Sequence, residues 1–313
     1  MASADSTGSV DVSADQRYAY EVEDLHKRYG DSTEPANAGL SFRIEEGEFF
    51  GLLGSNGAGK TTLIKQMIGL VRPDRGSIRL FGHDVFAHSR YTTTHVGYMP
   101  QTAFALNSLT VREAVYFSAH LRGMSIRAAK RERDTLLEAL GLTALARKVV
   151  RQLSGGERRL LQLAVTLTGA PPVLILDEPT NELDPSRRRQ VWDLLRDLHQ
   201  RDGRTVILIT HNAIEAEQVI ERVGIMREGE LVALGAPAEL KSSLRSRVRL
   251  TITLGEGDVL PDYLRIQSEH RGRVVALVDS ADLPRLTKDV DLTRFPEFTI
   301  HTATLEDVYV TYA

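Results

Sequence analysis

The chain has 313 residues, of which 42% are hydrophobic, enough for one large domain with an appendage or for two modest domains. Its 39 basic and 42 acidic residues give a formal net charge of -3, so no long-range basic field favours nucleic acid or an anionic membrane. The absence of cysteine excludes a disulfide framework, a thiolate metal site and a cysteine nucleophile.

The first residues are rich in Ser, Asp and Ala and have neither a basic start nor an apolar core. They fit neither a signal peptide nor a transit peptide, and we expect residues 1–16 to form a disordered tail. No apolar run approaches the roughly 18 residues that spanning a bilayer requires. We therefore expect a protein that does not enter the membrane by itself.

From Tyr18 onward, short β-type runs alternate with helical patterns, which predicts an α/β core. The clearest buried strands are three compact apolar runs at 49–53, 173–176 and 205–209, each flanked by turn or charged residues. The first two of these strands are followed directly by candidate functional residues, which are described below.

Between the first two of these strands the pattern becomes helical. Thr110 and Glu113 have the spacing of a capping box, Ser125 can cap a charged helix over 126–140, and Gly141 can end that helix. These signals predict a helical subdomain at about 102–168, inserted into the α/β domain.

The pattern changes again after the polar stretch 241–243. Alternating apolar residues at 248–254 and a run at 273–278 predict strands, and the spacing within 305–309 predicts a helix. We infer a small α/β appendage. The expected units are a tail over 1–16, a core domain over 17–241 and an accessory domain over 242–313.

A glycine-rich loop follows the strand at 49–53 and precedes an apolar helical run at 63–68, which is the context of a phosphate-binding loop. Its backbone N–H groups can close around phosphates, Lys60 should bridge the β- and γ-phosphates, and the Thr61 hydroxyl should ligate Mg²⁺. The alternative is a chance glycine-rich turn, which the flanks argue against. The expected phosphate-binding residues are Gly54, Ser55, Asn56, Gly57, Ala58, Gly59, Lys60, Thr61 and Thr62.

The strand at 173–176 ends in two adjacent carboxylates, Asp177 and Glu178. An acidic residue at such a strand end usually holds Mg²⁺ beside a phosphate loop, a role that we assign to Asp177. Adjacent residues of an extended segment face opposite sides, so Glu178 is expected to orient or deprotonate the attacking water. Without the phosphate loop, a solvated acidic turn would be the better interpretation.

A second phosphate-facing loop stands about a hundred residues after the first. The stretch 153–159, with sequence LSGGERR, leads a small-residue turn into a helix, and a helix N-terminus attracts anions through its unpaired N–H groups and its dipole. No internal repeat is visible, so the second loop is not a product of domain duplication.

With these motifs in order, the chain resembles the ATP-binding cassette (ABC) ATPases over nearly all of 18–240. The stretch 153–157 is similar to the signature motif of that family, which adenylate kinases, GTPases and recombinases lack. The resemblance implies a phosphate-loop NTPase core with a mixed sheet and an inserted helical subdomain, and it implies ATP and Mg²⁺ as cofactors.

The resemblance also implies roles for residues that, taken one at a time, would be interpreted as ordinary turn, loop or strand-end side chains. Tyr29 would stack on adenine, Gln101 would touch Mg²⁺ or the attacking water, and His211 would bind the γ-phosphate and hold Glu178 in place. Asp184 would lie in a loop at a dimer seam. The signature residues, which would act on the ATP of a partner subunit, are Ser154, Gly155, Gly156 and Glu157.

Two positions depart from the common family pattern. Ser55 stands where proline is frequent, and Glu182, where a small residue is usual, puts a charge near the dimer seam. No position needed for hydrolysis is lost.

The resemblance implies an ATPase subunit of a bacterial transporter, and segments 222–237 and 304–309 look most like the ABC-2 exporter group. The implied partners are a second ABC ATPase subunit and an integral permease, which would hold the protein at the inner, cytoplasmic face of the cell membrane. An importer ATPase is the alternative. An ABC ATPase acting on nucleic acid or the ribosome is disfavoured, because the chain shows no sustained heptads, duplication or basic charge.

Overall fold

The computed structural model describes residues 17–30, 33–102, 106–210, 217–242, 244, 247–255, 260–261, 263–270, 272–290, 295 and 297–312. The predicted tail over 1–16 and the predicted site residue His211 lie outside the described residues.

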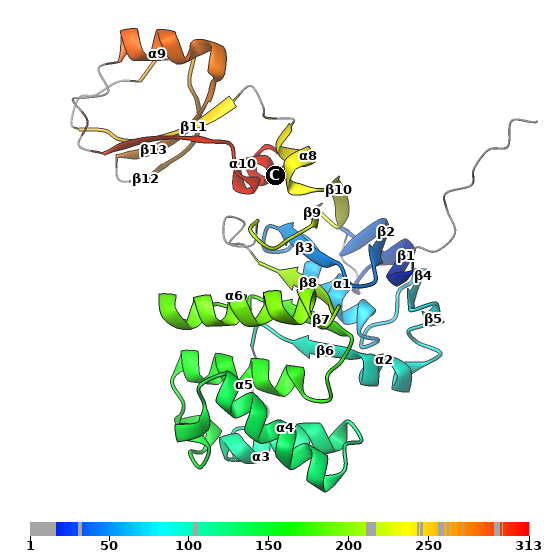
Figure 1. The fold of residues 1–313 in the computed structure, drawn as a ribbon. Helices are drawn as coiled ribbons and strands as arrows, with labels where there is room; N and C mark the ends of the chain where they lie inside the picture. Colours follow the sequence, from blue (N-terminus) through cyan, green and yellow to red (C-terminus); the bar gives the residue numbers. More distant parts are fainter. Residues whose placement is uncertain are drawn as a thin grey trace, which may run out of the picture.

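The centre of the molecule is a six-stranded mixed sheet in the order β10-β9-β3-β8-β7-β6 (Figure 1). Its strands are β3 (Phe49–Gly54), β6 (Val96–Met99), β7 (Val173–Asp177), β8 (Thr205–Ile209), β9 (Arg222–Arg227) and β10 (Glu230–Gly235). All neighbours pair in parallel except β10 with β9. The three strands predicted from apolar runs are therefore β3, β7 and β8, at the centre of this sheet.

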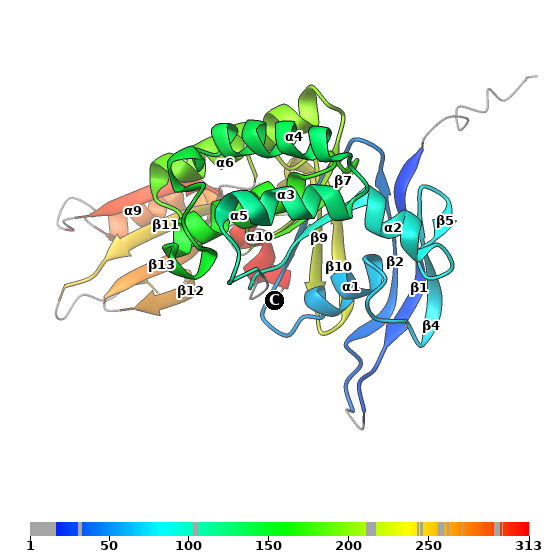
Figure 2. The ribbon, with the colours of Figure 1, turned by 90° about the horizontal axis from the view of Figure 1, so that it is seen from below.

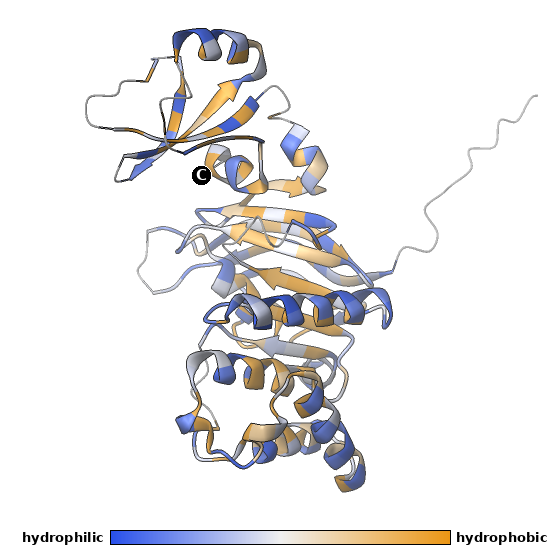
Figure 3. Cartoon of the chain, turned by 60° about the vertical axis from the view of Figure 1, so that its left-hand side comes forward, coloured by the Kyte–Doolittle hydropathy of each residue, from blue (hydrophilic) through white to orange (hydrophobic). Residues whose placement is uncertain are grey.

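Both faces of the central sheet are covered, which explains why its strands are apolar almost throughout (Figure 3). Leu174 and Leu176 of β7 pack in one core with α5 (Gly155–Leu167) and α6 (Pro185–Gln200). Val173 and Ile175 of the same strand pack in a second core with α1 (Lys60–Met67).

An antiparallel sheet in the order β2-β1-β4-β5 completes the second core. Its strands are β1 (Tyr18–Lys27), β2 (Asn37–Glu45), β4 (Arg75–Leu80) and β5 (His83–Asp84), and the short helix α2 (Ser89–His95) follows. The buried Tyr20 hydroxyl donates a hydrogen bond to the carbonyl of Met67 at 3.0 Å, which joins this sheet to the end of α1.

The helices α3 (Val111–Leu121), α4 (Ile126–Ala139) and α5 gather on the side of the molecule away from the C-terminal residues (Figure 1). Short 3₁₀ turns at Thr143–Leu145 and Val150–Gln152 lead into α5. The predicted capping box of Thr110 and Glu113 is present, and Ser125 caps α4 by accepting from the N–H of Ala128. No described helix is long and apolar enough to cross a membrane.

The C-terminal residues form a second antiparallel sheet in the order β12-β13-β11-β14, with α9 (Leu283–Asp289) packed on one face around a separate small core. Its strands are β11 (Arg247–Thr253), β12 (Arg265–His270), β13 (Arg273–Asp279) and β14 (Phe298–Thr302). In Figure 2 this accessory unit and the N-terminal antiparallel sheet lie at opposite ends of the molecule.

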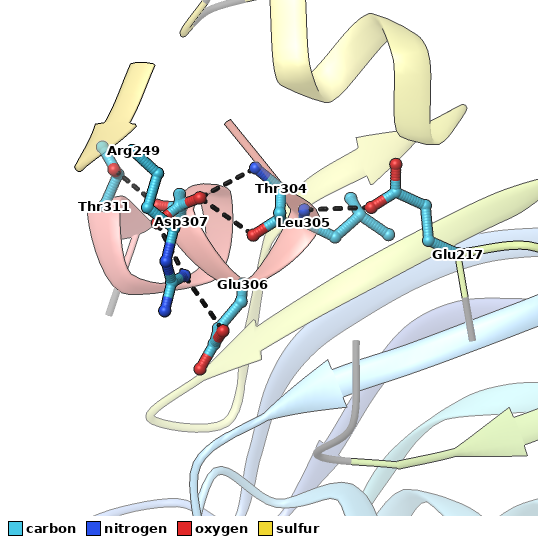
Figure 4. Close-up of polar contacts among 7 residues, drawn as sticks. All are labelled: Glu217, Arg249, Thr304, Leu305, Glu306, Asp307 and Thr311. Atoms are coloured by element: carbon cyan, nitrogen blue, oxygen red, sulfur yellow. Dashed lines mark hydrogen bonds and ion pairs between the residues drawn. The ribbon is translucent and has the colours of Figure 1, made fainter. Parts of the chain in front are cut away.

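The last helix, α10 (Leu305–Tyr312), leaves this accessory unit and packs against α8 (Pro237–Ser242) and β9. The Leu305 side chain is fully buried in the core that also holds α5 and α6. Its N–H donates to Glu217 Oε2 at 3.3 Å (Figure 4).

A buried carboxylate fixes the start of α10. Asp307 is fully buried and accepts hydrogen bonds from the backbone N–H and the hydroxyl of Thr304, both at 2.8 Å. Arg249 of β11 pairs with Asp307 and Glu306 at 3.0 Å (Figure 4). The accessory sheet and the core domain are thus tied together through one short helix.

Candidate nucleotide site

The glycine-rich loop turns sharply from β3 into α1. Gly59 precedes the helix with a left-handed φ of 98°, and α1 starts at Lys60, three residues before the apolar run that marked it in the sequence. The Lys60 ammonium donates to the carbonyls of Gly54 and Ser55 at 2.7 and 2.8 Å. The lysine therefore lies back over the loop, with its charge at the centre of the turn.

A pocket opens above this loop at the carboxyl ends of the parallel strands, the edge where such sheets bind ligands. It gathers side chains from β7, the phosphate loop and the segment after β6, all of which meet at this edge. The residues that line it are Tyr29, Ala36, Gly54, Asn56, Gly57, Gly59, Lys60, Thr61, Thr62, Gln101, Asp177, Glu178 and Ile209.

Two predicted loop residues do not line the pocket. Ser55 contributes its carbonyl to Lys60 instead, and Ala58 is buried at 2% exposure. Ala36 lines the pocket without having been predicted, and it also supports the loop from below, because its carbonyl lies directly against Gly59.

The carboxylates of Asp177 and Glu178 differ in backbone conformation, and this difference does not come from strand alternation. Asp177 is the last residue of β7, whereas Glu178 has a left-handed φ of 52° and lies beyond the strand. Glu178 is 8% exposed and accepts a hydrogen bond from the Thr210 hydroxyl at 3.1 Å. The direction of the Glu178 side chain is therefore set by a local turn and not, as predicted, by alternation along an extended segment.

Burial makes the ionised forms of this site costly in the protein alone. Desolvation, and then the neighbouring charge of Glu178, raise the pKa of Asp177, while Arg159 and Lys60 oppose that rise. Desolvation lowers the pKa of Lys60, and the two carboxylates oppose that fall. A cation beside Asp177 and an anion beside Lys60 would each favour the ionised form of these side chains.

Tyr29 and Gln101 both reach this pocket. Tyr29 is 47% exposed, and Lys27 Nζ lies 5.6 Å from the centroid of its ring, so one ring face already attracts a cation. Gln101 is exposed, and a hydrogen bond from its backbone N–H opposes the rise in the pKa of Asp177 that desolvation causes.

The second phosphate-facing loop does not contribute to this pocket. Ser154 caps α5 by accepting from the Glu157 N–H at 3.3 Å, and Glu157 accepts in return from the Ser154 N–H at 2.9 Å. Among the described residues, those lining the phosphate-loop pocket include none of 154–157. Gly155 instead lines a neighbouring pocket together with Glu182, whose carboxylate lies against it.

Asp184, predicted for a dimer seam, has a structural part within the single chain. Its side chain accepts from the N–H groups of Ser186 and Arg187, both at 3.0 Å, and so caps α6. The sequence pattern offered a signal for this cap, because proline follows Asp184 at the first helical position.

The structure also brings Arg159 to this site, a residue for which no sequence pattern predicted a role. This buried side chain lies beneath Asp177 and Glu178 and contacts their backbone carbonyls. No spacing rule marks it, because its partners are distant in the chain.

A buried strand, a phosphate loop, a helix and an acidic strand end together define a phosphate-loop nucleotide-binding protein. The ABC transporter family model matches residues 38–181, a span that holds both the phosphate loop and the signature loop.

Two curated proteins with similar sequences are both ATP-binding proteins of transporters. The Nod factor export ATP-binding protein I of Burkholderia orbicola (strain AU 1054) is 43% identical over 219 residues, which cover 70% of this chain and 71% of that protein. The human phospholipid-transporting ATPase ABCA7 is 41% identical over 231 residues, which cover 74% of this chain but 11% of ABCA7. This chain therefore spans only a small part of the second relative.

Solved structures with a similar fold also belong to ABC transporters. One neighbour is cbiO1 of Clostridium perfringens, part of the ABC transporter complex cbiONQ, with a TM-score of 0.65, 29% identity and coverage of 73% of this chain and 92% of that one. Another is a dimeric structure of MJ0796, a bacterial ABC transporter cassette, with a TM-score of 0.65, 25% identity and coverage of 69% and 98%. The chain belongs to the ABC transporter family and is an ATP-binding ATPase of that family.

Proposed function

We propose that this chain is the ATP-hydrolysing subunit of an ABC-2 type exporter, working at the inner face of the cell membrane with a separate integral permease. The observation that carries the catalytic part is the pocket that joins Lys60, Asp177 and Glu178. The export part is supported by the relative named for Nod factor export, because the alignment with that relative covers 70% of this chain.

The pocket suits ATP with Mg²⁺. Thr61, Gln101 and Asp177 all line it, and they offer hydroxyl, amide and carboxylate oxygens, which are the donors that Mg²⁺ prefers. The chemistry that the ion would supply there is positive charge to offset the negative charge of the phosphates during hydrolysis. A cation beside Asp177 and phosphates beside Lys60 would also offset the cost of burying these two charges.

The remaining catalytic and binding roles are proposed for Glu178, Tyr29 and His211. Glu178, held by Thr210, would orient or deprotonate the attacking water, and Tyr29 at the pocket would stack on adenine. His211 follows Thr210 in the chain and would contact the γ-phosphate.

We further propose that two such subunits act as a dimer. The loop of Ser154, Gly155, Gly156 and Glu157 forms a capped helix N-terminus that does not line its own phosphate-loop pocket, so it would serve the ATP of a partner subunit. In a two-fold pair this creates two composite sites from one interface. Asp184 would lie near that seam while capping α6.

The two domains that the sequence predicts would have different roles. The core domain over 17–241 would bind and hydrolyse ATP, and the permease would dock near Gln101 and the helical region Thr102 to Arg133. The domain over 242–313 would be an accessory to it. No nucleic acid is expected as a partner.

The catalytic assignment is tested with Glu178→Gln. The amide keeps the size of the side chain but cannot accept a proton, so we expect turnover to fall by roughly 10²–10⁴-fold while ATP binding persists. Steady-state hydrolysis and equilibrium nucleotide binding measure the two effects. Unchanged turnover would show that Glu178 is not the general base.

The transport assignment is tested by fractionation. We expect the protein to sediment with membranes and to copurify, after solubilisation, with an integral partner. Sedimentation with ribosomes would contradict it, and a partner that drives uptake would favour the importer alternative.

A further inference from the structure

Arg159 is a cation buried inside the core domain. It is the fifth residue of α5, its exposed fraction is 5%, and burial lowers the pKa of its guanidinium. A guanidinium carries five N–H donors in a rigid fork, and a buried donor without a partner is costly. The acceptors of these N–H groups therefore show which parts of the fold Arg159 holds together.

One side of the guanidinium holds the strand end that carries the predicted metal ligand and general base. Arg159 Nε donates to the carbonyl of Glu178 at 3.1 Å, and Nη2 donates to the carbonyls of both Asp177 and Glu178. These bonds hold the backbone at the left-handed turn that aims the Glu178 carboxylate.

The other side of the guanidinium holds the segment after β6. Arg159 Nη1 donates to the carbonyls of Pro100 and Gln101, both at 3.0 Å, and to the side-chain oxygen of Gln162 at 2.8 Å. One side chain of α5 thus joins the backbones that bear Gln101, Asp177 and Glu178.

Ser154 is the N-cap of the same helix. Five residues of α-helix rise about 7.5 Å, so Arg159 lies little more than one turn from the predicted contact with a partner's nucleotide. A shift of the helix N-terminus would carry Arg159, and with it the two backbones that it holds.

We propose that Arg159 is a positioning residue that couples the signature loop of one subunit to that subunit's own catalytic carboxylates. This inference rests on the proposed roles of Gln101, Asp177 and Glu178. The partner's ATP orders Ser154 and α5, and Arg159 then sets Gln101 and Glu178 in register for hydrolysis.

The test compares Arg159→Lys and Arg159→Gln with Arg158→Lys. Lysine keeps the charge but not the fork, and glutamine keeps neither. Arg158 is the matched control: it is the neighbouring residue on the same helix, and within the described part of the chain it donates to the carbonyl of Leu153, at 3.5 Å, and not to the backbones that Arg159 holds.

Four quantities are measured for each variant: kcat, KM for ATP, affinity of the purified subunit for a fluorescent ATP analogue, and ATP-driven dimerisation in the Glu178→Gln background. We expect both Arg159 variants to lose roughly ten- to a hundredfold in kcat, because misplacing catalytic groups by about 1 Å has effects of that size. Nucleotide affinity and dimerisation should stay within about threefold of the parent, and Arg158→Lys should behave like the parent.

Unchanged kcat in both Arg159 variants would overturn the proposal. So would parallel losses of kcat, nucleotide affinity and thermal stability, or unfolding of both variants, because these are the marks of a residue that only supports the fold. Failure of the general-base assignment is distinguishable, since it would appear as normal turnover of Glu178→Gln with intact Arg159.

Discussion

Two glycines of the phosphate loop have left-handed backbones in different surroundings. Gly57 has a φ of 87° and Gly59 a φ of 98°, so an added Cβ is strained at both. At Gly57 that Cβ would meet nothing within 4 Å, whereas at Gly59 it would collide with the carbonyl oxygen of Ala36. The first position is open toward the pocket, and the second is packed against the fold.

We therefore expect Gly59→Ala to lower the free energy of unfolding by ~1–3 kcal/mol more than Gly57→Ala, because the strain is shared and the collision is not. Denaturant unfolding without nucleotide measures this difference. Gly57→Ala should fold and lose ATP affinity instead. Equal stability of the two variants would mean that Ala36 does not support the loop.

Asp177 provides a prediction for pH. Its pKa is raised in the folded protein, so ionisation of this carboxyl favours the unfolded state at neutral pH, and the cost disappears once pH falls below the ordinary carboxyl pKa. We expect Asp177→Asn, in chelator and without nucleotide, to unfold at a higher temperature than the parent at pH 7. The gap should close as pH falls through the raised pKa toward the ordinary one, and a variant less stable at pH 7 would contradict this account.

Sequence patterns predicted these residues unevenly. Lys60 and Asp177 follow a spacing rule tied to a strand end, and both line the pocket. Arg159 follows none, because its partners Gln101 and Glu178 lie 58 and 19 residues away. Only the packing of α5 against the central sheet brings them together.

At the scale of elements, α5 shows how one cap can serve both folding and function. Ser154 caps this helix, and Lys148 adds an ion pair to the Glu157 side of the capping box at 3.2 Å. The same N-terminus is the one that we propose to face a partner's phosphate.

These two duties can be separated with Ser154→Asp and Ser154→Ala. Aspartate caps a helix about as well as serine, whereas alanine costs ~0.5–2 kcal/mol. We expect Ser154→Asp to keep thermal stability and ATP binding of the isolated subunit but to lose dimer-dependent turnover, because its carboxylate repels the phosphate. If turnover of the two variants followed their stability instead, the loop would have only a structural role.

Two strands, β14 and β1, lack a clear sequence pattern for different reasons. Strand β14 alternates Phe298 and Ile300 with polar residues, but it is only five residues long and exposed throughout, so this alternation is too short to predict a strand. In β1 the pairing with β2 shifts register between Val22 and Leu25, and this irregularity breaks the period of two. Strands β3, β7 and β8 were predictable because burial on both faces makes them apolar throughout.

At the scale of the whole molecule, α10 raises the question of whether the accessory unit is an independent appendage. Leu305 of α10 is fully buried in the core shared with α5 and α6, and Leu286 of α9 is fully buried in the separate core of the accessory sheet. Both are leucines on helices near the C-terminus, but they support different bodies.

We expect Leu305→Ala to destabilise the core domain by ~2–5 kcal/mol, because the cavity opens in the core behind the central sheet. Leu286→Ala should destabilise the accessory sheet by a similar amount and leave the core domain, and hence ATP binding, unchanged. Thermal unfolding with and without ATP measures this, since ATP shifts only the transition of the unit that binds it. If Leu305→Ala left the ATP-sensitive transition in place, α10 would be a tether that the core domain can lose; a shift would make the C-terminal helix part of the ATPase fold.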